Sequence, residues 1–147
     1  MKTKSIPNEI LLTETARLIA EGRNVTHLVR GNSMAPFLAD RRDKVVLSPF
    51  SEKQLKRGTV VLARDTSERI VLHRIVRHSK GKVILMGDGN ARETETTDVA
   101  HIMGMATLLI RKGKTYSVTG CHWKIYSFLW INLLPLRRIL LWIWRKL

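Results

Sequence analysis

A serine and a histidine carry the chemistry that this sequence could perform. Ser33 lies in the segment 31–36, which reads GNSMAP, and His73 lies in a later apolar run. A serine hydroxyl is a weak nucleophile at neutral pH, so hydrolysis needs a base within hydrogen-bond reach and donors for the oxyanion. An imidazole, with an ordinary pKa of about 6.5, can take that proton at pH 7 without the burial that a lysine needs. The pair therefore suggests nucleophilic hydrolysis, provided that the fold brings the two residues together.

Each residue taken alone has a plainer interpretation. Asn, Gly and Ser are typical of turns, which would make Ser33 a turn residue. Alternation puts His73 on one strand face with Val71 and Ile75, where an isolated histidine is more often structural than catalytic. The remaining histidines have no metal-ligand spacing with carboxylates, so we expect no metal and no cofactor.

The elements that must position these residues form a mainly β domain. Residues 8–22 have apolar side chains at roughly helical spacing and predict a short N-terminal helix. From residue 24 the period changes to two, with turn residues between the runs, which predicts an antiparallel sheet. The expected strands are 25–30, 44–47, 59–64, 70–77, 83–87, 103–111 and 115–118.

Four segments in one order carry a resemblance to a known family. They are residues 31–36, directly after an alternating strand, then 43–47, 55–62, and 70–76 followed by GDGN at 87–90. In this order they resemble the serine peptidases that include the type I signal peptidases and the self-cleaving repressors of the SOS type. The resemblance covers about residues 25–104 and implies the signal-peptidase type of antiparallel β domain.

The resemblance assigns roles to Ser33 and His73. It implies that Ser33 is the nucleophile and that the general base lies in the strand 70–76. Most bacterial members have a lysine there, whereas this chain has His73. In this respect it is similar to the serine–histidine signal peptidases of the endoplasmic reticulum and of some Gram-positive bacteria and archaea.

Two aspartates are candidates for the acid that would orient His73. A serine–histidine pair benefits from a carboxylate that holds the imidazole and stabilises its charged form. In the resembling branch a Gly-Asp-Asn segment is followed by a second aspartate, which favours Asp98 as the acid and leaves Asp88 a supporting structural role. This chain departs from the pattern, because a longer gap containing Glu93 and Glu95 precedes Asp98. Asp88 also begins an Asp-Gly pair, which is a preferred turn sequence.

The remaining site residues lie beside the serine. The backbone N–H of Ser33 is the first expected oxyanion donor, and the side chain of Asn32 is a possible second. We expect Met34 to line the substrate cleft or the core, and Pro36 to line the cleft. The resemblance implies that substrate binds as an added extended strand, with main-chain hydrogen bonds and shallow side-chain pockets.

Charge and composition set the C-terminal part of the chain apart. The 147 residues suit a single domain, with 26 Lys and Arg against 12 Asp and Glu and a net charge of +14. No acidic residue lies in 99–147, and all four tryptophans lie at 123, 130, 142 and 144. We divide the chain into an N-terminal helix at 1–23, a peptidase-like β domain at 24–120 and a basic, Trp-rich helical segment at 121–147.

Three arrangements of this last segment are open. The apolar run 125–136 is shorter than the roughly 20 residues that cross a bilayer, and Arg137 and Arg138 follow it. We favour a hairpin or a helix kinked at Pro135 that lies on an anionic membrane surface, with the basic residues among the headgroups. The alternatives are a helix packed on its own domain or on a partner subunit, and a tilted span.

These observations predict a membrane-associated serine endopeptidase of the signal-peptidase type. Its substrate is expected to be a peptide or protein precursor. We expect the protein to be located at the cytoplasmic face of the inner membrane. One alternative is a self-cleaving regulator, although the chain before Ser33 is short for a DNA-binding domain with a scissile linker. The other is a non-catalytic basic binding module, but the basic residues accompany tryptophans and aliphatics and form no base-stacking platform, which argues against nucleic acid. The oligomeric state stays open.

Overall fold

The computed structural model describes residues 8–29, 34, 38–89 and 93–147. The helices are α1 (Asn8–Ala20), α2 (Cys121–Asn132) and α3 (Leu134–Lys146), with short 3-10 turns at Glu52–Gln54 and Val99–His101. The strands are β1 (Val25–Leu28), β2 (Lys44–Ser48), β3 (Val60–Arg64), β4 (Ile70–Ser79), β5 (Lys82–Met86), β6 (Glu95–Asp98), β7 (Ile102–Arg111) and β8 (Lys114–Ser117).

The strands form one antiparallel eight-stranded sheet. Its order is β1-β2-β7-β3-β4-β5-β6, and β8 pairs with β7. Strand β7 is central because β2 lies along one of its edges while β3 and β8 share the other. The expectation of an antiparallel β domain with helices at both ends is confirmed. The sequence did not predict β6, because its ETTD segment has no apolar alternation.

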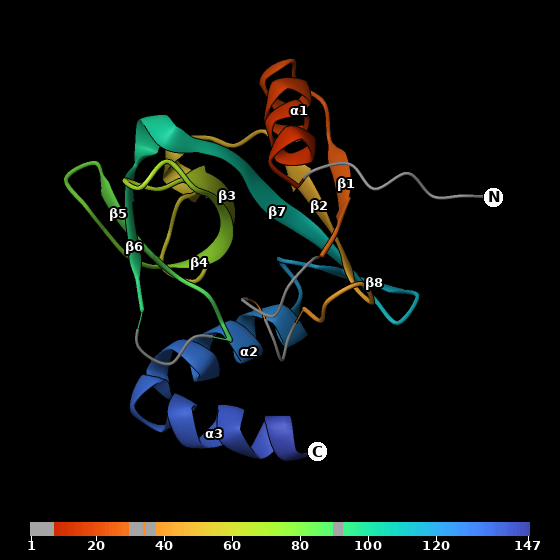
Figure 1. Ribbon diagram of the computed structural model, residues 1–147, viewed down its shortest axis with the longest axis vertical. Coiled ribbons are helices and arrows are strands. Elements are labelled where there is room, and N and C mark those ends of the chain that lie inside the picture. The colour runs from red at the N-terminus through yellow and green to blue at the C-terminus, as the bar shows by residue number, and fades with distance from the viewer. Residues whose placement is uncertain (1–7, 30–33, 35–37, 90–92) are drawn as a thin grey trace.

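The sheet is strongly curved into a half-barrel. The pairing register shifts once between β2 and β7, once between β3 and β7 and once between β4 and β5. Each such shift inserts an extra residue on one strand, which bends the strand and increases its twist. Figure 1 shows the result, with β3 to β6 wrapping round one side of the molecule and β1, β2 and β8 on the other.

Two apolar clusters cover the two faces of the sheet. Alternation along β3 sends Val60 and Leu62 to the first cluster and Val61 and Ala63 to the second. The first cluster lies under α1, which crosses β7 so closely that a Cβ at Gly104 would lie 2.7 Å from Cδ1 of Ile19. The faces of β4 follow from the same alternation, and this decides where His73 points.

The C-terminal segment is a helical hairpin packed against the sheet. Helix α2 ends at Asn132, and α3 begins at Leu134 with Pro135 in its first turn, where a missing N–H costs nothing. Of the expected headgroup residues, Arg137 was placed wrongly. It is fully buried and donates to the carbonyls of Trp130 and Gly87, at 3.1 and 3.4 Å. In the part of the chain that the structure describes, no helix is long and apolar enough to cross a membrane.

Candidate active site

The imidazole of His73 lies inside the curved sheet. His73 pairs with Val61 of β3, and it shares a strand face with Val71 and Ile75, which belong to or pack against the second cluster. Only 6% of the residue is exposed. The ring is therefore almost completely shielded from solvent.

Glu95 is the carboxylate that meets this imidazole. Residue Glu95 of β6 pairs with Leu85 of β5, which in turn pairs with Ile75 of β4. This row of partners places Glu95 on the same face of the sheet as Ile75, and His73 lies on that face two residues before Ile75. Oε2 of Glu95 lies 2.7 Å from Nδ1 of His73. The two side chains are 9% and 7% exposed. With Nδ1–H donating to the carboxylate, the neutral ring carries its lone pair on Nε2.

Asp98 lies elsewhere. It caps the 3-10 turn after β6, where its Oδ1 accepts from the backbone N–H of His101 and lies 2.5 Å from Nδ1 of the same residue. Asp98 is three positions after Glu95, and side chains three positions apart on a strand point to opposite faces. The structure thus gives the contact with His73 to Glu95, where the sequence favoured Asp98.

Asp88 forms a buried ion pair with the residue that follows His73. Its two carboxylate oxygens accept from Nε and Nη2 of Arg74 at 2.8 and 2.7 Å, and neither side chain is exposed. Burial disfavours the charge of Arg74, but the paired carboxylate outweighs it and raises the pKa of the guanidinium. The described contacts of this candidate acid thus join it to Arg74, the neighbour of His73.

The same ion pair fastens α2 to the sheet. Arg74 also donates to Oγ of Ser127 at 2.5 Å and to the carbonyl of Gly58 at 3.0 Å. Asp88 accepts from the hydroxyl of Tyr126 at 3.1 Å, and its carbonyl accepts from the indole of Trp130 at 3.1 Å. Burial, and then the nearby Asp88 carboxylate, raise the pKa of Tyr126, so this hydroxyl stays a donor. Sequence reasoning missed Arg74, although a charge inside the apolar run IVLHRIV signals a buried partner.

Met34 is the described residue nearest in sequence to Ser33. It is 1% exposed and packs in the first cluster, so it lies in the core. Its Sδ accepts from the backbone N–H of Asp88 at 3.5 Å. Ser33, Asn32 and Pro36 lie outside the described residues, so the expected serine–histidine contact and oxyanion donors are not described.

Among the described strands, β4 has a neighbour on one side only at residues 70–73. Strand β3 pairs with β4 from Ile70 to Arg74, whereas β5 begins its pairing at Arg74 and continues toward Ser79. Among the described strands, residues 70–73 therefore have no neighbour on the β5 side. An extended peptide could pair with such an edge through main-chain hydrogen bonds.

No family model matches the chain, and no curated protein or solved structure does. Within the described ranges, no three His, Cys, Asp or Glu side chains gather to hold a metal ion. The chemistry of the site therefore rests on the geometry of His73 and its neighbours.

Proposed function

We propose that this protein is a serine endopeptidase that cleaves a peptide or protein precursor, with Ser33 as nucleophile and His73 as base. The observation that carries the proposal is the 2.7 Å contact between Nδ1 of His73 and the carboxylate of Glu95. A buried carboxylate on this nitrogen fixes the ring tautomer and stabilises the imidazolium that forms when Nε2 takes a proton. We assign that role to Glu95.

Met34, the sequence neighbour of Ser33, lies close to the strand that carries this base. Consecutive Cα atoms are about 3.8 Å apart, so Ser33 is tethered to Met34. Met34 contacts Asp88, and Asp88 is paired with Arg74, the neighbour of His73. Met34 belongs to the cluster on the Arg74 side of β4. The proposed reaction therefore requires the hydroxyl of Ser33 to reach Nε2 of His73 around the edge of β4 at 70–73, where no described strand pairs on the β5 side.

The proposed reaction is acyl transfer to water. Oγ of Ser33 attacks the scissile carbonyl while its proton passes to Nε2 of His73, and the imidazolium then protonates the leaving amine. Water, deprotonated by the same nitrogen, hydrolyses the acyl ester and restores the serine. The N–H of Ser33 and the side chain of Asn32 would stabilise the oxyanion. The substrate would lie along the edge of β4 as an added strand.

A serine-reactive fluorophosphonate probe tests the nucleophile without a known substrate. We expect the probe to label the parent protein at Ser33 and to leave Ser33→Ala unlabelled, because only an activated serine forms the phosphonyl ester. The control is Ser79→Ala, an exposed serine on the same strand as His73, which should be labelled like the parent. Intact-mass measurement gives the extent of labelling. Equal labelling of Ser33→Ala and the parent would remove Ser33 from the proposal.

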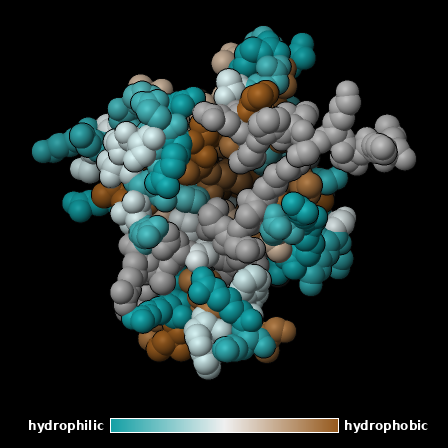
Figure 2. Space-filling view, viewed as in Figure 1, coloured by the Kyte–Doolittle hydropathy of each residue, from teal (hydrophilic) through white to brown (hydrophobic). Residues whose placement is uncertain are grey.

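We also propose that the C-terminal helices rest on an anionic membrane surface. One face of α2 and α3 packs on the domain while the other exposes large apolar side chains, and no acidic residue lies in 99–147. The exposed side chains are Ile125, Phe128, Leu129, Leu136, Ile139, Trp142, Ile143 and Trp144. Figure 2 shows hydrophobic patches beside hydrophilic ones at the end of the molecule where α3 lies. This mixture suits the boundary between headgroups and acyl chains.

Cosedimentation with phosphatidylglycerol vesicles tests this surface. Ile139→Ser/Ile143→Ser removes two apolar side chains that are 57% and 45% exposed, and we expect binding to weaken roughly tenfold or more. Ile10→Ser/Leu108→Ser removes two exposed apolar side chains far from α3 in the chain, at 61% and 37%, and should bind like the parent. Equal loss of binding by both double variants would show that the helices are not the docking surface. Binding of the parent to neutral phosphatidylcholine vesicles as strong as to phosphatidylglycerol vesicles would show that the surface does not need anionic lipid.

A further inference from the structure

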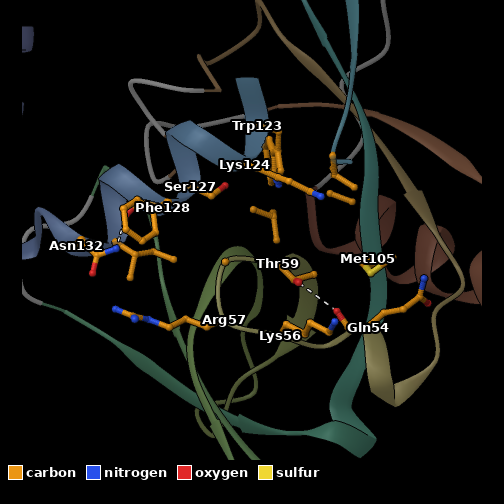
Figure 3. Close-up of a pocket in the computed structure, with 15 residues that line it drawn as sticks. Gln54, Lys56, Arg57, Thr59, Met105, Trp123, Lys124, Ser127, Phe128 and Asn132 are labelled. Carbon is orange, nitrogen blue, oxygen red and sulfur yellow. Dashed lines mark hydrogen bonds between the residues drawn. The ribbon is translucent and has the colours of Figure 1, made fainter. Parts of the chain in front are cut away.

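A pocket lies between α2 and the sheet, away from His73 and Glu95. Its volume is about 470 Å3, within the usual range of ligand pockets. Figure 3 shows Trp123, Ser127 and Phe128 of α2 along one wall, with Thr59 and Met105 across from them. We call this cavity the α2 pocket. Its apolar lining is Val60, Met105, Ala106, Val118, Trp123, Phe128 and Ile131.

The charged residues that line the pocket are all basic. Lys56 and Arg57 stand on the turn before β3, and Lys124 projects from the first turns of α2. All three are exposed, and none of them forms an ion pair within the described part of the chain. The pocket therefore combines an apolar interior with a rim of uncompensated positive charge.

Several other polar groups of the lining are engaged inside the protein. Thr59 donates to the carbonyl of Gln54 at 3.1 Å and Asn132 to that of Phe128 at 2.7 Å, as Figure 3 shows. The hydroxyl of Ser127 is held by Arg74. A ligand rich in hydroxyl or amide groups would find few free partners here, which leaves the cations as the polar recognition elements.

The backbone of the walls is also paired. The N–H of Gly58 donates to the carbonyl of Ile75 at 2.7 Å, and the carbonyl of Thr59 accepts from Ile75 at 2.8 Å. On the other side, the backbone of helix α2 is bonded within the helix. An extended peptide would lose the hydration of its amides without regaining hydrogen bonds, whereas a hydrocarbon chain has no such requirement.

We propose that the α2 pocket binds a single anionic amphiphile, with its acyl chain among the apolar side chains and its phosphate or carboxylate head on Lys56, Arg57 and Lys124. Phe128 lines the pocket and is also 66% exposed on the apolar face of the C-terminal helices. A chain leaving the pocket would thus be continuous with that face. This site is distinct from the proposed catalytic residues and does not depend on them.

Calorimetric titration with dodecyl phosphate below its micelle concentration tests the proposal. We expect one saturable site whose affinity falls roughly tenfold or more on shortening the chain by two methylenes, because each methylene is buried. Dodecanoate in a parallel titration distinguishes a carboxylate head from a phosphate head. Dodecyl maltoside, which has the same chain and no charge, should bind more weakly than either.

Two matched double variants make the same change of charge at two different places on the protein. Lys56→Glu/Arg57→Glu at the rim should weaken dodecyl phosphate binding by about tenfold or more, because an attraction becomes a repulsion. Arg77→Glu/Lys80→Glu, on exposed positions of the β4–β5 hairpin, should leave it unchanged. Equal losses in the two variants, or an affinity independent of chain length, would overturn the site. Ser33→Ala should bind like the parent, so failure of the peptidase proposal is read separately.

Discussion

Replacing Asp88 by alanine is expected to lower the free energy of unfolding by about 3–5 kcal/mol, because it leaves the buried charge of Arg74 without its partner. The guanidinium is fully buried, with Asp88 as its only ion-pair partner among the described residues. The substitution also removes an acceptor from Tyr126. Urea denaturation followed by circular dichroism measures the change.

Two further variants separate the ion pair from a general loss of packing. Arg74→Met/Asp88→Leu removes both charges and should be less destabilised than Asp88→Ala, since no unpaired charge remains. Glu68→Ala removes a carboxylate that is 82% exposed beside Arg64, and it should change stability far less. A loss of under about 1 kcal/mol for Asp88→Ala would mean that water or another group compensates Arg74.

Replacing His73 should have a large effect on catalysis. His73→Ala is expected to slow reaction of Ser33 with the fluorophosphonate probe by about 10²–10⁴-fold, the usual contribution of a general base. Glu95→Gln should slow it by about a hundredfold or more, because an amide does not stabilise the imidazolium as a carboxylate does. The rate of labelling at saturating probe, measured by intact mass, reports the chemical step.

Asp98→Asn is the matched control for Glu95→Gln. Both substitutions replace a carboxylate by its amide on β6, but Asp98 binds His101 while Glu95 binds His73. We expect Asp98→Asn to react at the parent rate and to have unchanged circular dichroism. The reverse result, with Asp98 essential and Glu95 dispensable, would restore the role that the sequence favoured for Asp98 and would refute the proposed role of Glu95.

The sequence could predict local features, but it could not predict contacts between residues that are far apart in the chain. Period-two alternation is local, so strands such as β3 and β4 could be predicted from it. The acid beside His73 could not, because its identity depends on the register between β5 and β6, which no local pattern records. The polar segment ETTD has neither apolar alternation nor a helical period, so the strand that carries Glu95 was not expected.

Burial of charge was the second point that the sequence could not decide. Arg74 and Arg137 stand in apolar segments, and composition alone reads such residues as exposed or as contacts for headgroups. The structure buries both, because carbonyls, aromatic rings and Asp88 converge on them from distant elements. Except for Trp130, which is seven positions from Arg137, these partners come from other parts of the chain, so only the assembled fold brings them together.

The bond from Arg74 to Ser127 has a consequence for how the chain matures. Ser127, Tyr126 and Trp130 all belong to α2, and Ser127 follows Arg74 by 53 positions in the chain. During synthesis β4 leaves the ribosome before α2 has been made. The guanidinium of Arg74 therefore stays hydrated until α2 has formed. Closure of the interior around Arg74 is thus a long-range event, and we expect folding to be slow and to require α2.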